Sequence, residues 1–455
     1  MVTDASTTTE SGLKRSLRSR HVTMISIGGI IGAGLFVGSS AAIAAAGPGI
    51  IVSYILAGLV ILLVMRMLSE MAIAYPHLGS FTEYARLGLG PLAGFVSGWL
   101  YWYFWVVVVA VEAIAGAQII AAWIDLPHWQ IGLGLMIVLT AVNLLSARSY
   151  GEFEYWFASI KVWAILAFIV VAGSYLFGWG PENAGGFNNL TAYGGIAPLG
   201  AVAVLAAITT VIFSLVGAEI AIIAAAESKE AARTISRLTV TILVRILLFY
   251  VFSILLILMI VPWNEITPGM SPFIVALERI GIPAAAPLMS VLVLTAVLSC
   301  LNSGVYVTSR VLFALAAQGD APQALVKLSK SRVPARAILL GSSLGFAAVL
   351  TAVISPSVLF AFLLNTSAAI MLIVYLILAL AQIRLRRKLE AEDPARLAIK
   401  MWLFPYASWL VVAAIAGVMV AMAFTNLRTE VLLSLACLAV AVAAYYVLRR
   451  ARGTP

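Results

Sequence analysis

The chain has 455 residues, of which 63% are hydrophobic and 10% are charged, and its formal net charge at neutral pH is +9. Soluble domains contain roughly 45–50% apolar and 25% charged residues, so this composition excludes a soluble globular protein. Apolar runs of about 20 residues, the length at which a helix crosses a bilayer core, exclude a membrane barrel, whose strands are short and alternating. The expected class is an all-α integral membrane protein.

Twelve apolar runs of this length follow one another along the chain. They lie approximately at residues 22–46, 49–75, 93–124, 128–146, 154–177, 197–226, 237–261, 284–317, 336–354, 357–383, 402–425 and 429–448. We expect twelve transmembrane helices, and the connections are too short to fold as separate domains. The first run is too long and too rich in glycine for a cleaved signal peptide.

The first run is interrupted by glycine. Five glycines lie within residues 26–40, and each costs about 1 kcal/mol relative to alanine inside a helix. Unwound backbone is tolerated in a bilayer only where protein buries it or where it lines a wet cavity, so an interrupted span points to a ligand site. Close helix packing is the alternative, because Gly28/Gly32 and Gly34/Gly38 have the small-xxx-small spacing. The sequence leaves both alternatives open.

A second interruption is expected in the sixth run, where Gly217 stands close to Glu219 half-way along the apolar segment. The sixth run comes five runs after the first, which is where an inverted repeat of five helices would place the partner of the first helix. Paired interrupted helices of this kind mark the substrate sites of secondary transporters. The repeat is inferred from position, since the two halves show no visible sequence similarity.

Ionisable residues at membrane depth are rare and are functional by default, because each needs a partner or a wet cavity. Glu112, Lys161 and Glu219 lie inside the third, fifth and sixth runs, and we predict functional roles for them. Three others are interpreted as structural ion pairs or as side chains that reach the membrane interface: Arg66, Glu70 and Arg245.

The basic residues fall on one side of the predicted membrane topology. They precede the first run or follow the sixth, eighth, tenth and twelfth runs: Lys14, Arg15, Arg18, Arg20, Lys229, Arg233, Arg237, Lys327, Lys330, Arg332, Arg336, Arg384, Arg386, Arg387, Lys388, Arg396, Lys400, Arg449, Arg450 and Arg452. On the opposite side the connections contain only two basic residues, Arg279 and Arg428. By the positive-inside rule, both termini are predicted to be cytoplasmic.

Enzymes and channels are less consistent with the sequence than a transporter. The chain has no HExxH motif, no paired metal ligands and no Ser-His-Asp set, and His21, His77 and His128 lie at loops or span ends. Cys300 and Cys437 lie in apolar runs and are interpreted as small buried hydrophobes without disulfide or metal roles. A channel would need pore-lining repeats around an oligomeric axis, whereas both interrupted helices lie in one chain. We therefore expect no metal, cofactor or nucleic acid.

Several motifs carry a family resemblance. They are residues 21–39, 66–72, 79–85, 149–156 and 213–219. Together they resemble the amino-acid permeases of the amino acid–polyamine–organocation (APC) superfamily, and the likeness runs from about residue 20 to residue 450. Within that superfamily the chain is most similar to bacterial γ-aminobutyrate (GABA) permeases, in residues 98–102, 299–303 and 318–322.

The resemblance implies a LeuT-type fold with a 5+5 inverted repeat, discontinuous helices 1 and 6, and two additional C-terminal helices. The implied parts are a cytoplasmic N-terminal tail (1–20), a transporter core (21–383) made of two five-helix repeats (21–177 and 197–383), helices 11 and 12 with the cytoplasmic loop before them (384–450), and a cytoplasmic C-terminal tail (451–455).

The resemblance also implies a substrate site, and the physics of helix ends agrees with it. A half-helix that starts near Gly32 would direct its amide N–H groups and its positive dipole end at a substrate carboxylate. Carbonyl groups at the two breaks would accept the ammonium group, Phe213 would form a lid or wall, and Glu112 would contribute at the distal end. The expected substrate-binding residues are Ile31, Gly32, Ala33, Gly34, Phe213, Ser214, Gly217 and Glu112.

Lys161 resembles the fifth-helix lysine whose amine replaces a sodium ion between the first and eighth helices in sodium-independent relatives. Its neighbours would be first-helix carbonyls and polar side chains of the eighth run. Burial disfavours the charged form of a lysine, so Lys161 can change protonation during the transport cycle. The residues expected to couple transport to protons rather than to sodium are Lys161, Glu219, Ser299, Asn302 and Ser303.

The expected function is a secondary active permease of the bacterial inner membrane that imports GABA or similar ω-amino acids by proton symport and alternating access. Its expected partners are the amino-acid substrate, protons and the lipid bilayer. A permease for neutral or aromatic α-amino acids is the alternative, because Ala33-Gly34 and residues 365–367 lie where relatives shape selectivity. A transporter-like nutrient sensor is a more distant alternative, which would need a cytoplasmic domain or long tail.

The topology makes a direct prediction. A cysteine introduced as Asn188→Cys or Asn426→Cys should react with an impermeant thiol reagent added from outside, because both positions lie in connections on the side poor in basic residues. Glu392→Cys should be protected. The reverse labelling pattern would overturn the assignment of both termini to the cytoplasm.

Overall fold

The computed structural model describes residues 31–76, 78, 80–145, 148–181, 185–219, 222, 235, 241–329, 333–351 and 356–451. These residues form helices joined by turns and contain no strand, so the expected all-α class is confirmed for this part of the chain. The first glycines of the interrupted run, Gly28 and Gly29, lie outside the described residues, as do His21 and His77.

The first half of the chain begins with two short helices in place of one span. Its elements are α2 (Ala33–Phe36), α3 (Gly38–Ala46), η2 (Gly47–Gly49), α4 (Ile50–Ala74), α5 (Phe81–Leu89), α6 (Pro91–Ala121), α7 (His128–Leu145), α8 (Arg148–Ser174) and η3 (Tyr175–Trp179). Val37 separates α2 from α3, so the first run is interrupted there within the residues described.

The described residues of the second half form a further series of helices. They are η4 (Gly186–Leu190), α9 (Ala201–Leu215), η5 (Ile246–Phe252), α12 (Ser253–Ile260), η6 (Trp263–Glu265), α13 (Pro272–Ile280), α14 (Ala285–Ala317), η7 (Gln323–Val326), α15 (Ala335–Thr351), α16 (Pro356–Glu392), η8 (Pro394–Arg396), α17 (Tyr406–Ala423) and α18 (Arg428–Ala451). All twelve predicted apolar runs overlap at least one of these helices or those of the first half.

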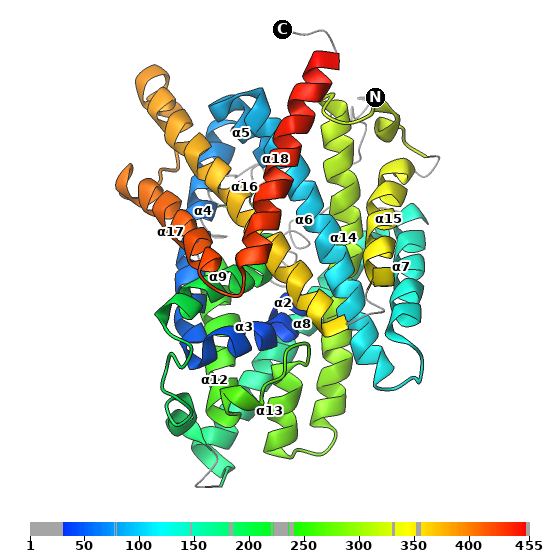
Figure 1. Ribbon diagram of the computed structural model, residues 1–455, viewed down its shortest axis with the longest axis vertical. Helices are drawn as coiled ribbons and strands as arrows, with labels where there is room; N and C mark the ends of the chain where they lie inside the picture. Colours follow the sequence, from blue (N-terminus) through cyan, green and yellow to red (C-terminus); the bar gives the residue numbers. More distant parts are fainter. Residues whose placement is uncertain are drawn as a thin grey trace, which may run out of the picture.

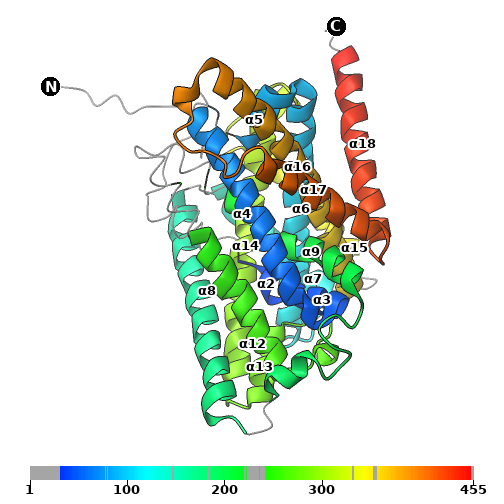
Figure 2. The same cartoon turned by 90° about the vertical axis from the view of Figure 1, so that its left-hand side faces the viewer.

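Nine helical stretches among the described residues are long and apolar enough to cross a membrane, with Gly38–Ala74 counted as one, and α9 and α15 are shorter apolar helices. The chain is therefore a multi-pass membrane protein. In Figures 1 and 2, α5 and the C-terminal end of α18 lie at one end of the molecule and α13 lies at the other. Helices α6 and α14 run side by side through the centre.

One predicted boundary differs clearly from the structure. The tenth run was expected to end at residue 383, but α16 continues to Glu392. Ion pairs one turn apart extend it, between Arg386 and Glu390 (2.8 Å) and between Lys388 and Glu392 (3.8 Å). Such pairs stabilise a helix after it has left the apolar region.

The interpretation of Glu70 as a structural group agrees with its contacts. Its carboxylate is buried, forms an ion pair with Arg386 on α16, and accepts hydrogen bonds from Gln382 Nε2 (2.7 Å) and the backbone N–H of Met401 (2.6 Å). Arg66 donates to the carbonyl oxygen of Lys400 (2.9 Å). These contacts join the end of α4 to α16 and to the segment before α17.

Candidate functional site

The predicted interruption of the sixth span is present. Helix α9 ends at Leu215, Val216 is extended, and Gly217 has a φ of +107°, a conformation that favours glycine. Helical conformation resumes at Ala218 and Glu219. The break frees backbone groups from the helix ladder, and one of them, the carbonyl oxygen of Ser214, accepts a hydrogen bond from Tyr250 Oη (2.7 Å).

The start of α2 lies against this break. A Cβ atom added to Gly34 would lie 2.9 Å from Ser214 Cα and 3.0 Å from a ring carbon of Phe213. Only glycine allows the two interrupted segments to approach so closely. At Gly38, an added Cβ would lie 2.7 Å from Leu364 Cδ1. Gly34 and Gly38 therefore allow close packing between helices. This packing role does not conflict with a ligand site between α2 and the break after α9.

The Glu112 side chain caps the N-terminal end of α2. Its two carboxylate oxygens both accept a hydrogen bond from the backbone N–H of Ala33, at 3.0 Å each. A Cβ atom on Gly32 would collide with this carboxylate and lie 2.7 Å from Cys300 Cβ. We expected Glu112 at the distal end of the site, where the substrate ammonium group would bind. Instead, its carboxylate contacts Ala33 N–H, which belongs to the residues expected to bind the substrate carboxylate. The reason is that the first N–H groups of a helix need acceptors, and α6 supplies one inside the membrane.

A small cavity lies between α2, α6, α9 and α14. Its lining is mostly apolar and includes a single carboxylate; the residues are Gly34, Phe104, Trp105, Val108, Glu112, Phe213, Ser214, Val216 and Cys300. The rings of Phe104 and Phe213 lie 5.9 Å apart and narrow it. The remaining space is of the size of one water molecule, so the site is closed in this conformation.

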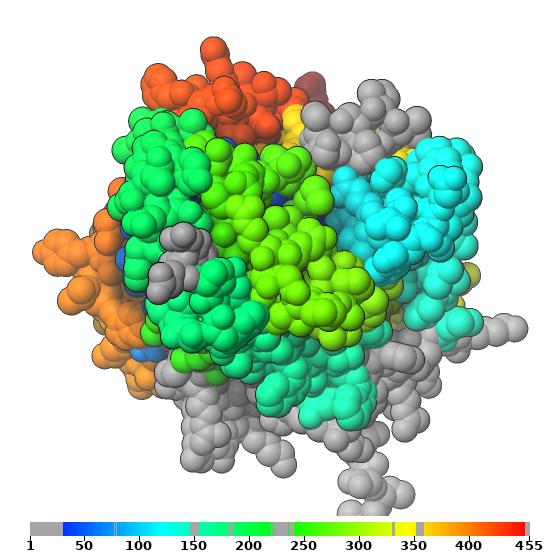
Figure 3. Space-filling model, turned by 90° about the horizontal axis from the view of Figure 1, so that it is seen from below, coloured from blue at the N-terminus to red at the C-terminus, as the bar shows by residue number. Residues whose placement is uncertain are grey.

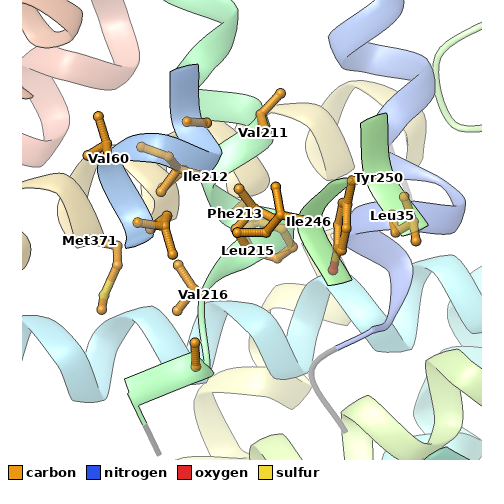
Figure 4. Close-up of a cluster of buried hydrophobic side chains, with 14 of the residues drawn as sticks. Leu35, Val60, Val211, Ile212, Phe213, Leu215, Val216, Ile246, Tyr250 and Met371 are labelled. Atoms are coloured by element: carbon orange, nitrogen blue, oxygen red, sulfur yellow. The ribbon is translucent and has the colours of Figure 1, made fainter. Parts of the chain in front are cut away.

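Apolar packing holds the broken sixth span in place. Figure 4 shows Val211, Ile212, Phe213, Leu215 and Val216 among side chains from other helices. Those helices are α2, α4, α16 and η5, through Leu35, Val60, Met371, Ile246 and Tyr250. Core side chains therefore surround the break on several sides.

Glu219 belongs to a separate network just after the break. It is 1% exposed and accepts hydrogen bonds from the backbone N–H of Gly217 (2.9 Å), Tyr101 Oη (3.1 Å) and Tyr375 Oη (3.3 Å). These donors come from the break itself, from α6 and from α16. Glu219 thus ties the second part of the sixth span to two neighbouring helices, away from the residues around Lys161.

Lys161 is paired with a carboxylate that the sequence analysis did not single out. Both side chains are buried, and Lys161 Nζ lies 3.7 Å from Glu154 Oε1 and makes no hydrogen bond to any residue that the structure describes. Glu154 accepts hydrogen bonds from Ser299 Oγ (2.8 and 2.9 Å) and from Ser303 Oγ (3.1 Å). Ser299 and Ser303, which were expected next to Lys161, therefore bind Glu154, and Glu154 in turn contacts Lys161.

The spacing along α8 could have identified this pair. Glu154 and Lys161 are seven residues apart, so they lie on the same face of the helix two turns from one another. Ser299 and Ser303 are four residues apart and share a face of α14. Asn302 points elsewhere and accepts a hydrogen bond from Asn143 Nδ2 on α7 (2.8 Å). Lys161 Nζ makes no hydrogen bond to a carbonyl of the described part of the first run, and the part of that run before Ile31 lies outside the described residues.

Comparison with known proteins shows which family has these features. The family model described as amino acid permease matches residues 21–451. The chain is 49% identical to the gamma-aminobutyric acid permease of Bacillus subtilis (strain 168), over 97% of this chain and 95% of that protein. It is 43% identical to the gamma-aminobutyric acid permease of Escherichia coli (strain K12), over 94% and 92%.

A more distant relative carries a different name. The chain is 38% identical to the aromatic amino acid transport protein AroP of Corynebacterium glutamicum, over 90% of each chain. These relatives are named as permeases or transport proteins, and the family model's match includes the interrupted spans, Glu112 and Lys161. The chain belongs to the amino acid permease family of the APC superfamily, whose members are membrane transporters and not enzymes.

Proposed function

We propose that the protein is a secondary active permease that imports GABA and similar ω-amino acids by proton symport and alternating access. The observation that carries the proposal is the carboxylate of Glu112 on the backbone N–H of Ala33. In this contact the Ala33 N–H group donates to a carboxylate, and the neighbouring Gly34 and Glu112 line the cavity between the two interrupted segments. In the proposal, the substrate carboxylate displaces Glu112 from that position.

We propose a cradle for the substrate carboxylate at the start of α2. Ile31, Gly32, Ala33 and Gly34 would surround the substrate carboxylate. Residues 32–34 are glycine or alanine, so the ligand could approach their backbone closely, and the amide dipoles favour a negative charge. Carbonyl groups near Ser214 and Gly217 would accept the ammonium group. The proposed architecture around this site is a LeuT-type fold with twelve spans in two inverted five-helix repeats.

An ω-amino acid suits this arrangement for two reasons. Its charges are separated by methylene groups, which the apolar walls at Phe104, Val108 and Phe213 can cover. Its ammonium group reaches farther from the cradle than that of an α-amino acid, and the displaced Glu112 carboxylate can meet it. The relatives at 49% and 43% identity that are named as GABA permeases also support this choice.

Neutral or aromatic α-amino acids are the second candidate substrates. The relative at 38% identity is named as an aromatic amino acid transport protein. Phe213 and the small residues of α2 can surround such a side chain as well as the methylenes of an ω-amino acid.

Proton coupling is proposed for the buried groups between α8 and α14. Lys161 and Glu154 form a pair of opposite charges in a low-dielectric environment, where gain or loss of one proton changes the local energy strongly. Ser299 and Ser303 hold Glu154 from the α14 side, so a protonation change would alter the contact between the two helices. Glu219 is a second candidate for the coupled proton. We further propose that both termini face the cytoplasm.

Substitutions in the cradle test the site. Gly32→Val and Gly34→Val should abolish GABA binding, because a branched side chain would occupy the space needed by the carboxylate. Calorimetry in detergent measures the binding, and Gly134→Val is the matched control, since nothing lies within 4 Å of its added Cβ. Normal affinity in a folded Gly32 or Gly34 variant would leave only the packing role.

Glu112→Gln tests substrate choice. The variant should weaken uptake of radiolabelled GABA more than uptake of any α-amino acid that is also carried, because only the longer substrate places its ammonium group near the displaced carboxylate. Proteoliposomes with a panel of unlabelled competitors provide the measurement. If excess GABA fails to compete with alanine, proline or phenylalanine uptake by the unmodified protein, the substrate assignment is wrong.

Lys161→Ala tests proton coupling. The variant should lose accumulation of substrate against a gradient while keeping most of its binding affinity, because Lys161 does not line the central cavity. The measurement is uptake into proteoliposomes driven by an imposed pH difference. Retained accumulation would move the coupling role to Glu112 or Glu219.

A further inference from the structure

A second cavity lies beyond α2, toward the end of the molecule that carries α13. It has a volume of about 400 Å³, and Figure 3 looks onto this end of the molecule. Its walls come from the α2–α3 junction, the end of α6, the loop before α13, α13 itself and the first part of α14. Unlike the central cavity, it is large enough to hold a small amino acid.

Two polar groups in this cavity make no hydrogen bond to any residue that the structure describes. Ser271 is 6% exposed, and its Oγ makes no hydrogen bond to any described residue. Gln118 Oε1 at the end of α6 is likewise shielded and without a hydrogen bond there. A buried polar group left unsatisfied costs about 1–3 kcal/mol, so a ligand that bonds to both groups would gain affinity from them.

The charge at the rim of the cavity is negative. Glu278 on α13 is exposed at the lining and has no ion pair within the residues that the structure describes. The adjacent Arg279 is engaged elsewhere, since its guanidinium contacts both carboxylate oxygens of Glu265, at 2.9 and 3.4 Å. The cavity mouth therefore attracts a cationic group.

The two cavities lie on either side of α2. Gly34 lines the central cavity and Val37 lines the outer one, and three residues of helix span only about 4.5 Å. The outer wall is attached to the same segment, because Gly269 N–H donates to Ser40 Oγ (2.9 Å) and the rings of Phe36 and Phe273 lie 5.1 Å apart. A rearrangement of α2 and α3 would therefore change both cavities.

We propose that the outer cavity is a second, transient binding site for the ammonium end of an amino-acid substrate, with Glu278 as its anion and Ser271 and Gln118 as its hydrogen-bonding groups. This inference rests on the proposed transport function. An ω-amino acid held in this way would present its carboxylate to α2, which is the orientation that the proposed cradle needs. The outer site thus orients the substrate before the central site opens.

Glu278→Gln is the test, with influx of radiolabelled GABA into proteoliposomes as the readout. The KM should rise about two- to fivefold, as expected for loss of one partly exposed charge interaction, with an unchanged maximal rate. The increase should shrink as ionic strength is raised, because salt screens an exposed charge. Ser271→Ala should raise the KM without this salt dependence. Asp125→Asn, which removes an exposed carboxylate in the α6–α7 connection, is the matched control.

The outcomes separate this inference from the proposed function. If the unmodified protein transports GABA but Glu278→Gln changes its KM no more than Asp125→Asn does, the outer site is refuted while the function stands. If the unmodified protein carries no ω-amino acid, the proposed function fails first. Equilibrium binding of GABA to the central site, measured by calorimetry, should be the same in Glu278→Gln and the unmodified protein, and a parallel loss there would also refute the outer site.

Discussion

The two hydrogen bonds between Ala33 N–H and the Glu112 carboxylate connect the first interrupted span to the central helix α6. A helix that begins inside a membrane leaves amide groups without partners, and the bilayer offers no water to satisfy them. Glu112 supplies the missing acceptor from a position where a charge would otherwise be costly. The glycines at 32 and 34 are required by the same contact, since a side chain at either position would separate α2 from α6 or α9.

The other buried charges are arranged around this contact without touching it. Glu219 is held by donors from the break of the sixth span, α6 and α16, and Glu154 is held by Lys161 and two serines. Buried ion pairs contribute little net stability, because desolvation offsets their attraction. The ion pair between Glu70 and Arg386 lies near the ends of α4 and α16 and has a structural role, because Glu70 also binds the segment before α17. Stability alone therefore does not explain the buried Lys161–Glu154 pair, which supports the proton-coupling role proposed for it.

Much of the fold could be predicted from the sequence because bilayer thickness sets the length of an apolar helix. The twelve runs, the break at Gly217 and the burial of Lys161 follow from hydropathy, glycine and charge. The short helix α5 and the extension of α16 were missed, since their amphipathic or charged sequences lie outside the apolar runs. Glu154 was missed because it stands at the predicted start of a span, where a carboxylate can also face water. The contact of Glu112 with Ala33 joins residues 79 positions apart, which no local pattern reveals.

The central claim is that a substrate carboxylate takes the position of the Glu112 carboxylate at the start of α2. The most direct measurement is an experimental structure of the protein with bound GABA. We expect the GABA carboxylate within hydrogen-bonding distance of Ala33 N–H, with the Glu112 side chain displaced toward the ammonium group. A bound GABA molecule elsewhere, with Glu112 still accepting both hydrogen bonds from Ala33, would contradict it.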